Sequence, residues 1–243
     1  MKLDISSKDK FVNNFISPLS RVTDSAVLKV VDKQITSIVA TSDNTIIISS
    51  KYADENIKAD KILNIPDLKK LHRVLSCIES ESFSLDIAQN YIGYSSDSIR
   101  FKYHLYDEGI INTPKINVDK VSSLVFDGEF AISYSTVAQL LKGSTISTES
   151  NKLYLSVKDQ AVFGELTDKT RSNVDSYGIR IAQNYTGTQF AVPIPLNFEI
   201  FRIISSMKFK EVNAKIITKM GVVTLDLDLE SSHFKFLISA LAN

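Results

Sequence analysis

The sequence contains an internal repeat, and this repeat limits the folds that the chain can adopt. Placing Ile65-Pro66 on Ile194-Pro195 sets an offset of 129 residues (195 minus 66) between two amphipathic segments. The residues that then coincide are Leu71 with Ile200, Val74 with Ile203, Leu75 with Ile204, Ile78 with Met207, Arg73 with Arg202 and Ser76 with Ser205. Because the polar face matches as well as the apolar face, duplication explains the likeness better than two unrelated amphipathic helices do.

The length and composition suit a duplicated intracellular protein. A chain of 243 residues has room for two domains of about 120 residues. With 44% hydrophobic and 23% charged residues, the composition is that of a globular protein and not of a disordered one. The single cysteine, Cys77, excludes a disulfide framework and a cysteine-based zinc site, and it suits a reducing cytoplasm. We expect no membrane span and no signal peptide, because apolar runs are short and Met1–Ile5 has the pattern of a strand.

The charge is balanced, with 28 basic and 28 acidic side chains. A protein that grips DNA by neutralising many phosphates usually carries a basic surplus. The balance therefore argues against a tight duplex binder, although it permits a protein that surrounds DNA and contacts it lightly.

Hydrophobic periodicity predicts the same order of elements in each half of the chain. Helical spacing predicts four helices, at 7–19 (ending near Pro18), 66–79, 133–142 and 196–207. Strand-like patterns occur at 26–31, 35–40, 45–50, 83–87, 91–94 and 98–105, and again at 121–132, 152–157, 161–166, 178–182, 189–194, 211–218, 222–229 and 233–241. Gly109 and Pro114 punctuate a segment without clear periodicity. We therefore expect an N-terminal domain at 1–106, a connector at 107–119 and a C-terminal domain at 120–243.

These features resemble the sliding-clamp family, in particular the two-domain clamps of T-even-type phages and the proliferating cell nuclear antigens. The resemblance lies in the tracts 189–202 and 232–241 and in the element order over 4–50. It implies an α+β protein with the DNA clamp fold, in which two duplicated domains each place antiparallel sheets and two helices around a central pore. Cellular two-domain clamps are typically acidic, so the neutral charge and the absence of an acidic tail favour a phage-type clamp.

The resemblance also implies a homotrimer. Helices that pack about 8–10 Å apart and are about 10 Å thick give a pore of about 26 Å for the twelve helices of a trimer, enough for a duplex about 20 Å wide. Eight helices in a dimer would leave only about 14 Å. The expected function is a processivity factor without enzymatic activity or cofactor that encircles duplex DNA. Its expected partners are the replicative DNA polymerase and a clamp-loader ATPase.

The polar faces of the four helices are the expected DNA-facing surface. Acidic residues are scarce there, so the lining is expected to be locally positive even though the chain is neutral. The expected DNA-facing residues are Lys8, Lys10, Asn14, Lys69, Lys70, Arg73, Gln139, Lys142, Arg202, Lys208 and Lys210. Flexible basic side chains would contact phosphates without reading sequence, so the ring could slide.

Two further surfaces follow from the resemblance. The expected subunit interface pairs the strand containing Ile99, Phe101 and Tyr103 with a neighbour's strand containing Ile179 and Ile181, although these side chains can equally face their own core. The expected pocket for polymerase and loader peptides comprises Ile38, Ile46, Ile110, Ile111, Ile116, Leu237 and Leu241. Anchoring of the connector to its own domains explains the apolar connector residues equally well.

Two other functional classes stay open. A ring-forming structural protein of a phage particle would have no DNA in its hole and would not need basic helix faces. A small enzyme would need converging polar groups, but the sequence has no phosphate-binding loop, no nucleophile motif and no metal-ligand spacing among its three histidines. Asp226 and Asp228 share one face of a strand, which is usually a solvated face.

Overall fold

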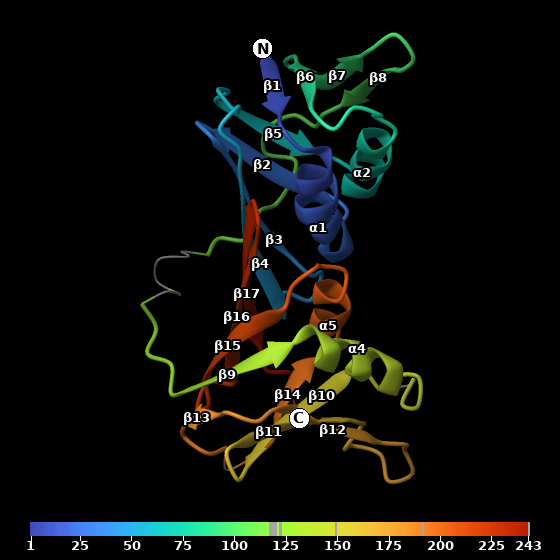
Figure 1. Cartoon of the computed structure of the whole chain (residues 1–243). Helices are drawn as coiled ribbons and strands as arrows, with labels where there is room; N and C mark the ends of the chain where they lie inside the picture. Colours follow the sequence, from blue (N-terminus) through green and yellow to red (C-terminus); the bar gives the residue numbers. More distant parts are fainter. Residues whose placement is uncertain (117–120, 122, 149, 191, 243) are drawn as a thin grey trace. The chain divides into compact units, whose positions relative to one another are not determined.

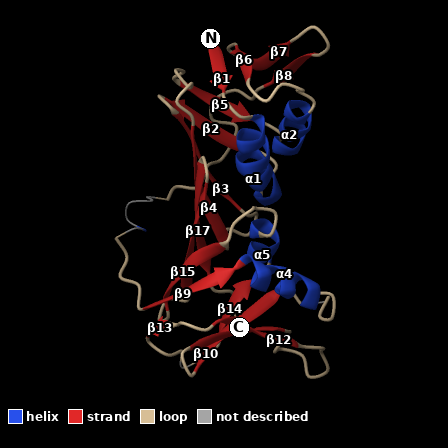
Figure 2. Cartoon of the chain, viewed as in Figure 1, coloured by secondary structure: helices blue, strands red, loops and turns tan. Residues whose placement is uncertain are grey.

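The computed structural model describes residues 1–116, 121, 123–148, 150–190 and 192–242. Within these residues, short helices pack on antiparallel sheets (Figure 1; Figure 2), so the α+β class is confirmed. The chain divides into two compact units, and each draws on three segments. Unit 1 comprises Met1–Ser42, Ile48–Ile116 and Asp228–Phe234, and unit 2 comprises Asp43–Ile47, Asn117–Leu227 and Lys235–Asn243. The domain boundaries expected from the sequence stay a proposal, and residues 117–119 of the expected connector lie outside the described part.

Unit 1 contains most of the first half of the chain. Its elements are β1 (Lys2–Ile5), η1 (Asp9–Ile16), α1 (Ser17–Val22), β2 (Ala26–Val31), β3 (Gln34–Ala40), β4 (Ile46–Ala53), β5 (Lys61–Ile65), α2 (Leu68–Ser76), β6 (Phe83–Ile87), β7 (Tyr91–Ser95) and β8 (Arg100–His104). One sheet has the strand order β1-β6-β7-β8, and other strands are neighbours in the order β5-β2-β3-β4. The first two residues of β4 belong to unit 2.

Unit 2 repeats this arrangement. Its elements are β9 (Gly128–Ser133), α4 (Tyr134–Gly143), β10 (Lys152–Lys158), β11 (Ala161–Leu166), β12 (Tyr177–Ala182), β13 (Thr186–Gly187), β14 (Ile194–Asn197), α5 (Glu199–Ile204), β15 (Glu211–Ile217), β16 (Val222–Leu229) and β17 (Ser232–Ser239). Strands are neighbours in the orders β12-β11-β10-β14 and β13-β9-β15-β16-β17. The first residues of β17 and the last of β16 belong to unit 1.

Strand pairing confirms the duplication independently of the helices. The order β5-β2-β3-β4 matches β14-β10-β11-β12, and β1-β6-β7-β8 matches β9-β15-β16-β17. In unit 1, Ala26 of β2 lies opposite Ile65 of β5, and in unit 2, Leu155 of β10 lies opposite Ile194 of β14. Both members of the second pair follow those of the first by 129 residues (155 minus 26, and 194 minus 65). The offset found from the helix faces therefore also holds for a sheet register.

The first helix continues past Pro18, so the expectation that it ends there is wrong. η1 has π-helical turns, and at its end the Ser17 N–H donates to the carbonyl of Val12, five residues back. Pro18 then lies in the first turn of α1, where the N–H that proline lacks is not needed. The expected apolar stripe of Phe11, Phe15, Ile16 and Leu19 is buried.

Three other sequence predictions need correction. The strand expected from residue 121 begins at Gly128, because Asp127 before it binds the Thr218 N–H and hydroxyl through its carboxylate. The strand expected over 189–194 is β14, which begins at Ile194 and shortens the helix expected from residue 196. β5 was not expected, since its five residues form a strand only by pairing with β2.

The core of unit 1 is an aromatic cluster beneath η1. Phe11 and Phe15 lie with ring centroids 6.0 Å apart, and both rings contact Tyr52 of β4 at 5.2 and 5.7 Å. The ring of Phe234 lies 6.3 Å from that of Phe15. Because large aromatic rings bury much apolar area, this cluster fixes which side of η1 is left for solvent.

Candidate nucleic-acid interface

The start of α2 is fixed by hydrogen bonds on two sides. The Asp67 carboxylate accepts from the Lys70 N–H at 2.7 Å as the N-cap. The Tyr103 hydroxyl of β8 donates to the Asp67 carbonyl at 2.7 Å and accepts from the Asp67 N–H at 3.0 Å. Leu68, Leu71, Leu75 and Ile78 are buried as the periodicity predicts. α2 therefore has a fixed direction and a fixed outer face.

The outer face of α2 is basic. Lys69, Lys70 and Arg73 are exposed, and α2 contains no acidic residue. Lys69 forms an ion pair of 2.9 Å with Asp24, which precedes β2. Across the residues that the structure describes, Lys70 and Arg73 have no ion-pair partner. These two side chains are therefore available to an anion in solution.

His72 adds no charge to this face at neutral pH. It is partly buried, and burial lowers the pKa of its imidazole below the ordinary value, with a smaller contribution from the positive charge of Arg21. An imidazole with a lowered pKa is neutral near pH 7. The positive charge of α2 therefore comes from its two lysines and Arg73.

The expected DNA-facing residues at the start of the first helix contact unit 1 itself. The Lys8 ammonium donates to the Ile78 carbonyl at 2.6 Å, just beyond the end of α2. The Lys10 ammonium pairs with Glu230 at 2.5 Å. Asn14 is partly buried. Lys8 and Lys10 thus have structural contacts that compete with any contact to DNA.

In unit 2, α4 and α5 pack against each other as the helices of unit 1 do (Figure 2). Ser133 is the N-cap of α4, and its hydroxyl accepts from the Thr136 N–H at 3.1 Å. Val137 and Leu140 are buried, as expected. The expected DNA-facing residues that are exposed here are Gln139 and Lys142 of α4 and Lys208 and Lys210 after α5.

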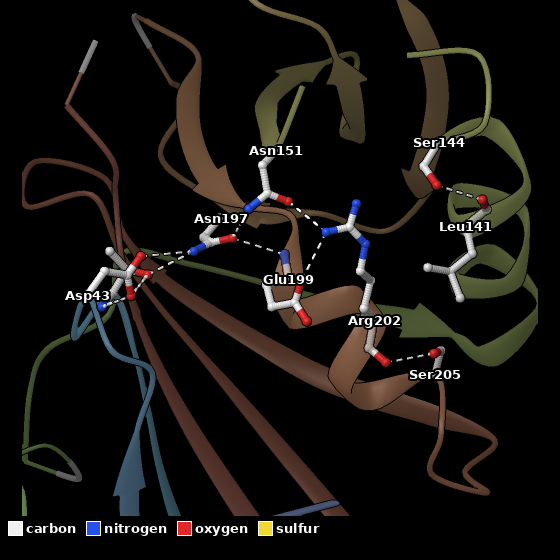
Figure 3. Close-up of polar contacts among 9 residues, drawn as sticks. Asp43, Leu141, Ser144, Asn151, Asn197, Glu199, Arg202 and Ser205 are labelled. Carbon is white, nitrogen blue, oxygen red and sulfur yellow. Dashed lines mark hydrogen bonds and ion pairs between the residues drawn. The ribbon is translucent and has the colours of Figure 1, made fainter. Parts of the chain in front are cut away.

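Arg202 of α5 lies in a polar network that its counterpart Arg73 lacks (Figure 3). Its Nη1 donates to Asn151 Oδ1 and to Glu199 Oε2, both at 2.9 Å. Its guanidinium carbon lies 5.1 Å from the centroid of the Phe198 ring. The side chain is 43% exposed. Arg202 is therefore partly neutralised and held in one orientation by its own unit.

Asn197 is the centre of this network. It is 7% exposed, and its Oδ1 accepts from Asn151 Nδ2 at 2.9 Å and from the Glu199 N–H at 3.0 Å. Its Nδ2 donates to Asp43 at 3.2 Å and to Thr45 at 3.0 Å (Figure 3). All four hydrogen-bonding positions of the amide are satisfied.

The sequence analysis did not identify Asn151 or Asn197. The signal was present, because the offset of 129 places the polar Asn197 on Leu68, a buried apolar residue of the other repeat. An asparagine in place of a core leucine indicates a local polar requirement, here the start of α5.

The two strands expected at the subunit interface are both sheet edges. β8 is the last strand of β1-β6-β7-β8, and β12 is the first strand of β12-β11-β10-β14. Ile99, Phe101 and Ile179 are partly buried, whereas Tyr103 and Ile181 are buried within their own units. Tyr103 and Ile181 therefore support the edges from inside, and the other side chains keep accessible surface.

The residues expected to form the partner pocket differ in exposure. In unit 1, Ile110 is 58% exposed, and Ile38, Ile111 and Ile116 are partly buried. In unit 2, Leu237 and Leu241 are partly buried. Ile46 is 0% exposed and lines no surface in this structure.

Other chemistry finds little support in the described part of the chain. No group of three or more His, Cys, Asp or Glu side chains there could hold a metal ion. No helix among the described residues is long and apolar enough to cross a membrane. Asp228, one of the two alternating aspartates, lies 2.6 Å from His233 as an exposed pair.

Comparisons with known proteins identify the fold. No protein-family model and no curated protein sequence matches the chain. Among solved structures, it is similar to the Proliferating Cellular Nuclear Antigen of Entamoeba histolytica, with a TM-score of 0.76 and 10% identity over 99% of this chain and 98% of that one. It is also similar to the A. fulgidus PCNA bound to the C-terminal region of FEN-1, with a TM-score of 0.75 and 11% identity over 100% of this chain and 98% of that one.

A bacterial protein of greater length shows the same likeness. The putative DNA polymerase III beta subunit of Eubacterium rectale matches with a TM-score of 0.73 and 13% identity, and the chain covers 66% of that subunit. The match extends over 100% of this chain. The strand order, the duplicated register and these matches over the whole length agree: the chain has the sliding-clamp fold.

Proposed function

We propose that the protein is a sliding clamp, a processivity factor without enzymatic activity that encircles duplex DNA and tethers the replicative polymerase to it. The observation that carries this proposal is the basic outer face of α2 in a chain with the sliding-clamp fold over its whole length. A ring that served only as a structural part of a particle would not need such a face.

The proposed contact with DNA is weak by design. Lys70 and Arg73 are long, exposed side chains that can reach phosphate oxygens without reading bases. A few such contacts are screened by salt, so the protein can slide, and enclosure of the duplex supplies retention. The zero net charge of the chain agrees with retention by enclosure and not by affinity.

The proposed assembly is a homotrimer closed by edge strands. β8 and β12 each leave one side without a strand neighbour in their sheets. Pairing of β8 with β12 of the next subunit would satisfy both edges and continue the sheets around the ring. Three chains supply the twelve helices that a pore for duplex DNA requires.

The proposed partner surface is the apolar part of the connector, with Ile110, Ile111 and Ile116, together with Ile38, Leu237 and Leu241. Ile46 is not included, since it is buried. The A. fulgidus PCNA was solved with the C-terminal region of FEN-1, which shows that a protein of this fold can take up a peptide. We expect peptides of the polymerase and of a clamp loader to bind here.

The test is primer extension on a singly primed circular template, with a polymerase and clamp loader that support the wild-type protein. We expect longer products when the protein is present and shorter ones with Arg73→Glu, while sedimentation shows the same trimer for both. A ring that forms but never lengthens the products would indicate the structural alternative. A protein that stays monomeric at high concentration would contradict the clamp.

A further inference from the structure

The helices of the two units carry different amounts of positive charge. η1, α1 and α2 of unit 1 contain five basic residues against one acidic residue, Asp9. α4 and α5 of unit 2 contain two basic residues, Lys142 and Arg202, against Glu199. The duplication has therefore conserved the fold of the helices but not their charge.

The difference is clearest at positions related by the offset of 129. Lys69 corresponds to Phe198, whose ring is buried, and Lys70 corresponds to Glu199. The one basic residue common to α2 and α5 is the pair Arg73 and Arg202. Unit 2 thus has a carboxylate where unit 1 has an ammonium group.

The surroundings of the two arginines differ in the same direction. Arg202 Nη1 is 2.9 Å from the Glu199 carboxylate and from the Asn151 amide oxygen (Figure 3). Arg73 is exposed and, in the described part of the chain, has no carboxylate partner. A phosphate that approached Arg202 would have to displace Glu199 or lie beside its negative charge, and like charges at such distances repel.

We propose that the protein contacts DNA unequally: the phosphate backbone is held mainly by α2 of unit 1, and Arg202 is a structural residue that Glu199 and Asn151 hold away from DNA. This inference rests on the proposed clamp function. In a ring of identical chains, basic and nearly neutral sectors would then alternate around the duplex. Such a ring has fewer phosphate contacts than one lined uniformly, which favours sliding.

The experiment compares matched variants in binding to a fluorescein-labelled 30-base-pair duplex, followed by anisotropy at low and moderate salt. We expect Arg73→Gln to weaken binding about three- to tenfold and to reduce its salt dependence, because it removes a phosphate contact. Arg202→Gln removes the same charge and should change the affinity less than twofold. Glu199→Gln should tighten binding, since it releases Arg202.

Thermal unfolding supplies the second readout. Arg202→Gln should lower the melting temperature, because Asn151 and Glu199 lose their partner, whereas Arg73→Gln should leave it unchanged. The inference is overturned if Arg202→Gln weakens DNA binding as much as Arg73→Gln, or if Glu199→Gln leaves the affinity unchanged. If the wild-type trimer binds no duplex even at low salt and does not lengthen primer-extension products, the proposed function itself fails.

Discussion

Ser6 donates two hydrogen bonds to the carboxylate of Asp54, from its backbone N–H at 2.8 Å and from its hydroxyl at 2.7 Å. The same carboxylate accepts from the Tyr52 hydroxyl at 3.1 Å and from the Asn56 N–H at 3.0 Å. Asp54 is 7% exposed. The contact joins the residue just before the first helix to the end of β4, although 48 positions separate the two in the sequence.

Asp54 is expected to make the stability of unit 1 sensitive to acid. Burial raises the pKa of its carboxyl, but the hydrogen bonds from Ser6, Asn56 and Tyr52 outweigh burial and bring the pKa below the ordinary value. A lowered pKa means that the stabilisation is present above the unfolded pKa of about 3.9 and is lost as the pH falls through the folded pKa. Asp54→Asn should cost about 2–3 kcal/mol at pH 7 and less at pH 3. Urea unfolding at both pH values measures this, with the exposed Asp60→Asn as control. An equal loss at both pH values would contradict the prediction.

Tyr103 is expected to give a corresponding loss at alkaline pH. Burial raises the pKa of its hydroxyl to about 12, against the smaller effect of its bond with the Asp67 backbone. A raised pKa means that the stabilisation is complete below the unfolded pKa of about 10 and is lost as the pH rises through about 12. Tyr103→Phe should cost about 1–2 kcal/mol at neutral pH by leaving the start of α2 without its partner. Absorbance titration near 295 nm should lose one high-pKa tyrosine in this variant but not in the exposed Tyr106→Phe.

Gly143 closes α4 against the edge strand of its sheet. A methyl group at this position would overlap the ring of Tyr177, the first residue of β12. Gly143→Ala should therefore destabilise the protein by about 1–3 kcal/mol, even though alanine favours helices by about 1 kcal/mol over glycine. Denaturant unfolding gives the sign directly. Gly178→Ala is the control, because a methyl group there meets no atom within 4 Å. A stabilised Gly143→Ala would show that Tyr177 moves aside without cost.

The edge strand β12 offers a test of ring closure. Ile179 is partly buried on this edge, so lysine at this position would put a charge into the proposed contact with β8. Ile179→Lys should sediment as a folded monomer where the wild type is a trimer. Val31→Lys is the matched control, because Val31 is an exposed apolar residue at the end of β2, away from both proposed edges. If both variants assemble like the wild type, the interface lies elsewhere.

The sequence alone predicted the buried faces well, because periodicity records which side of an element meets the core. Leu68, Leu71, Leu75 and Ile78 are buried as their spacing predicts. The offset of 129 residues, found from helix faces, also reproduced the pairing of β2 with β5 in that of β10 with β14. The resemblance to sliding clamps, first based on short tracts, is confirmed at the level of the fold.

Element boundaries were less predictable, since they depend on pairing and capping partners that are distant in the sequence. Pro18 indicated the end of a helix, yet the π-helical turns before it let the chain continue into α1. β5 exists through its pairing with β2. Neither feature has a local pattern that separates it from a turn.

The candidate site shows the same division between local pattern and tertiary environment. The sequence determined that Arg73 and Arg202 occupy equivalent positions on two duplicated helices, because the repeat fixes their place on the polar face. Only the tertiary structure decided that Arg202 is paired with Glu199 and Asn151 while Arg73 is exposed. The physical reason is that the free energy of a charge depends on what surrounds it, and Asn151 reaches Arg202 from 51 positions away in the chain.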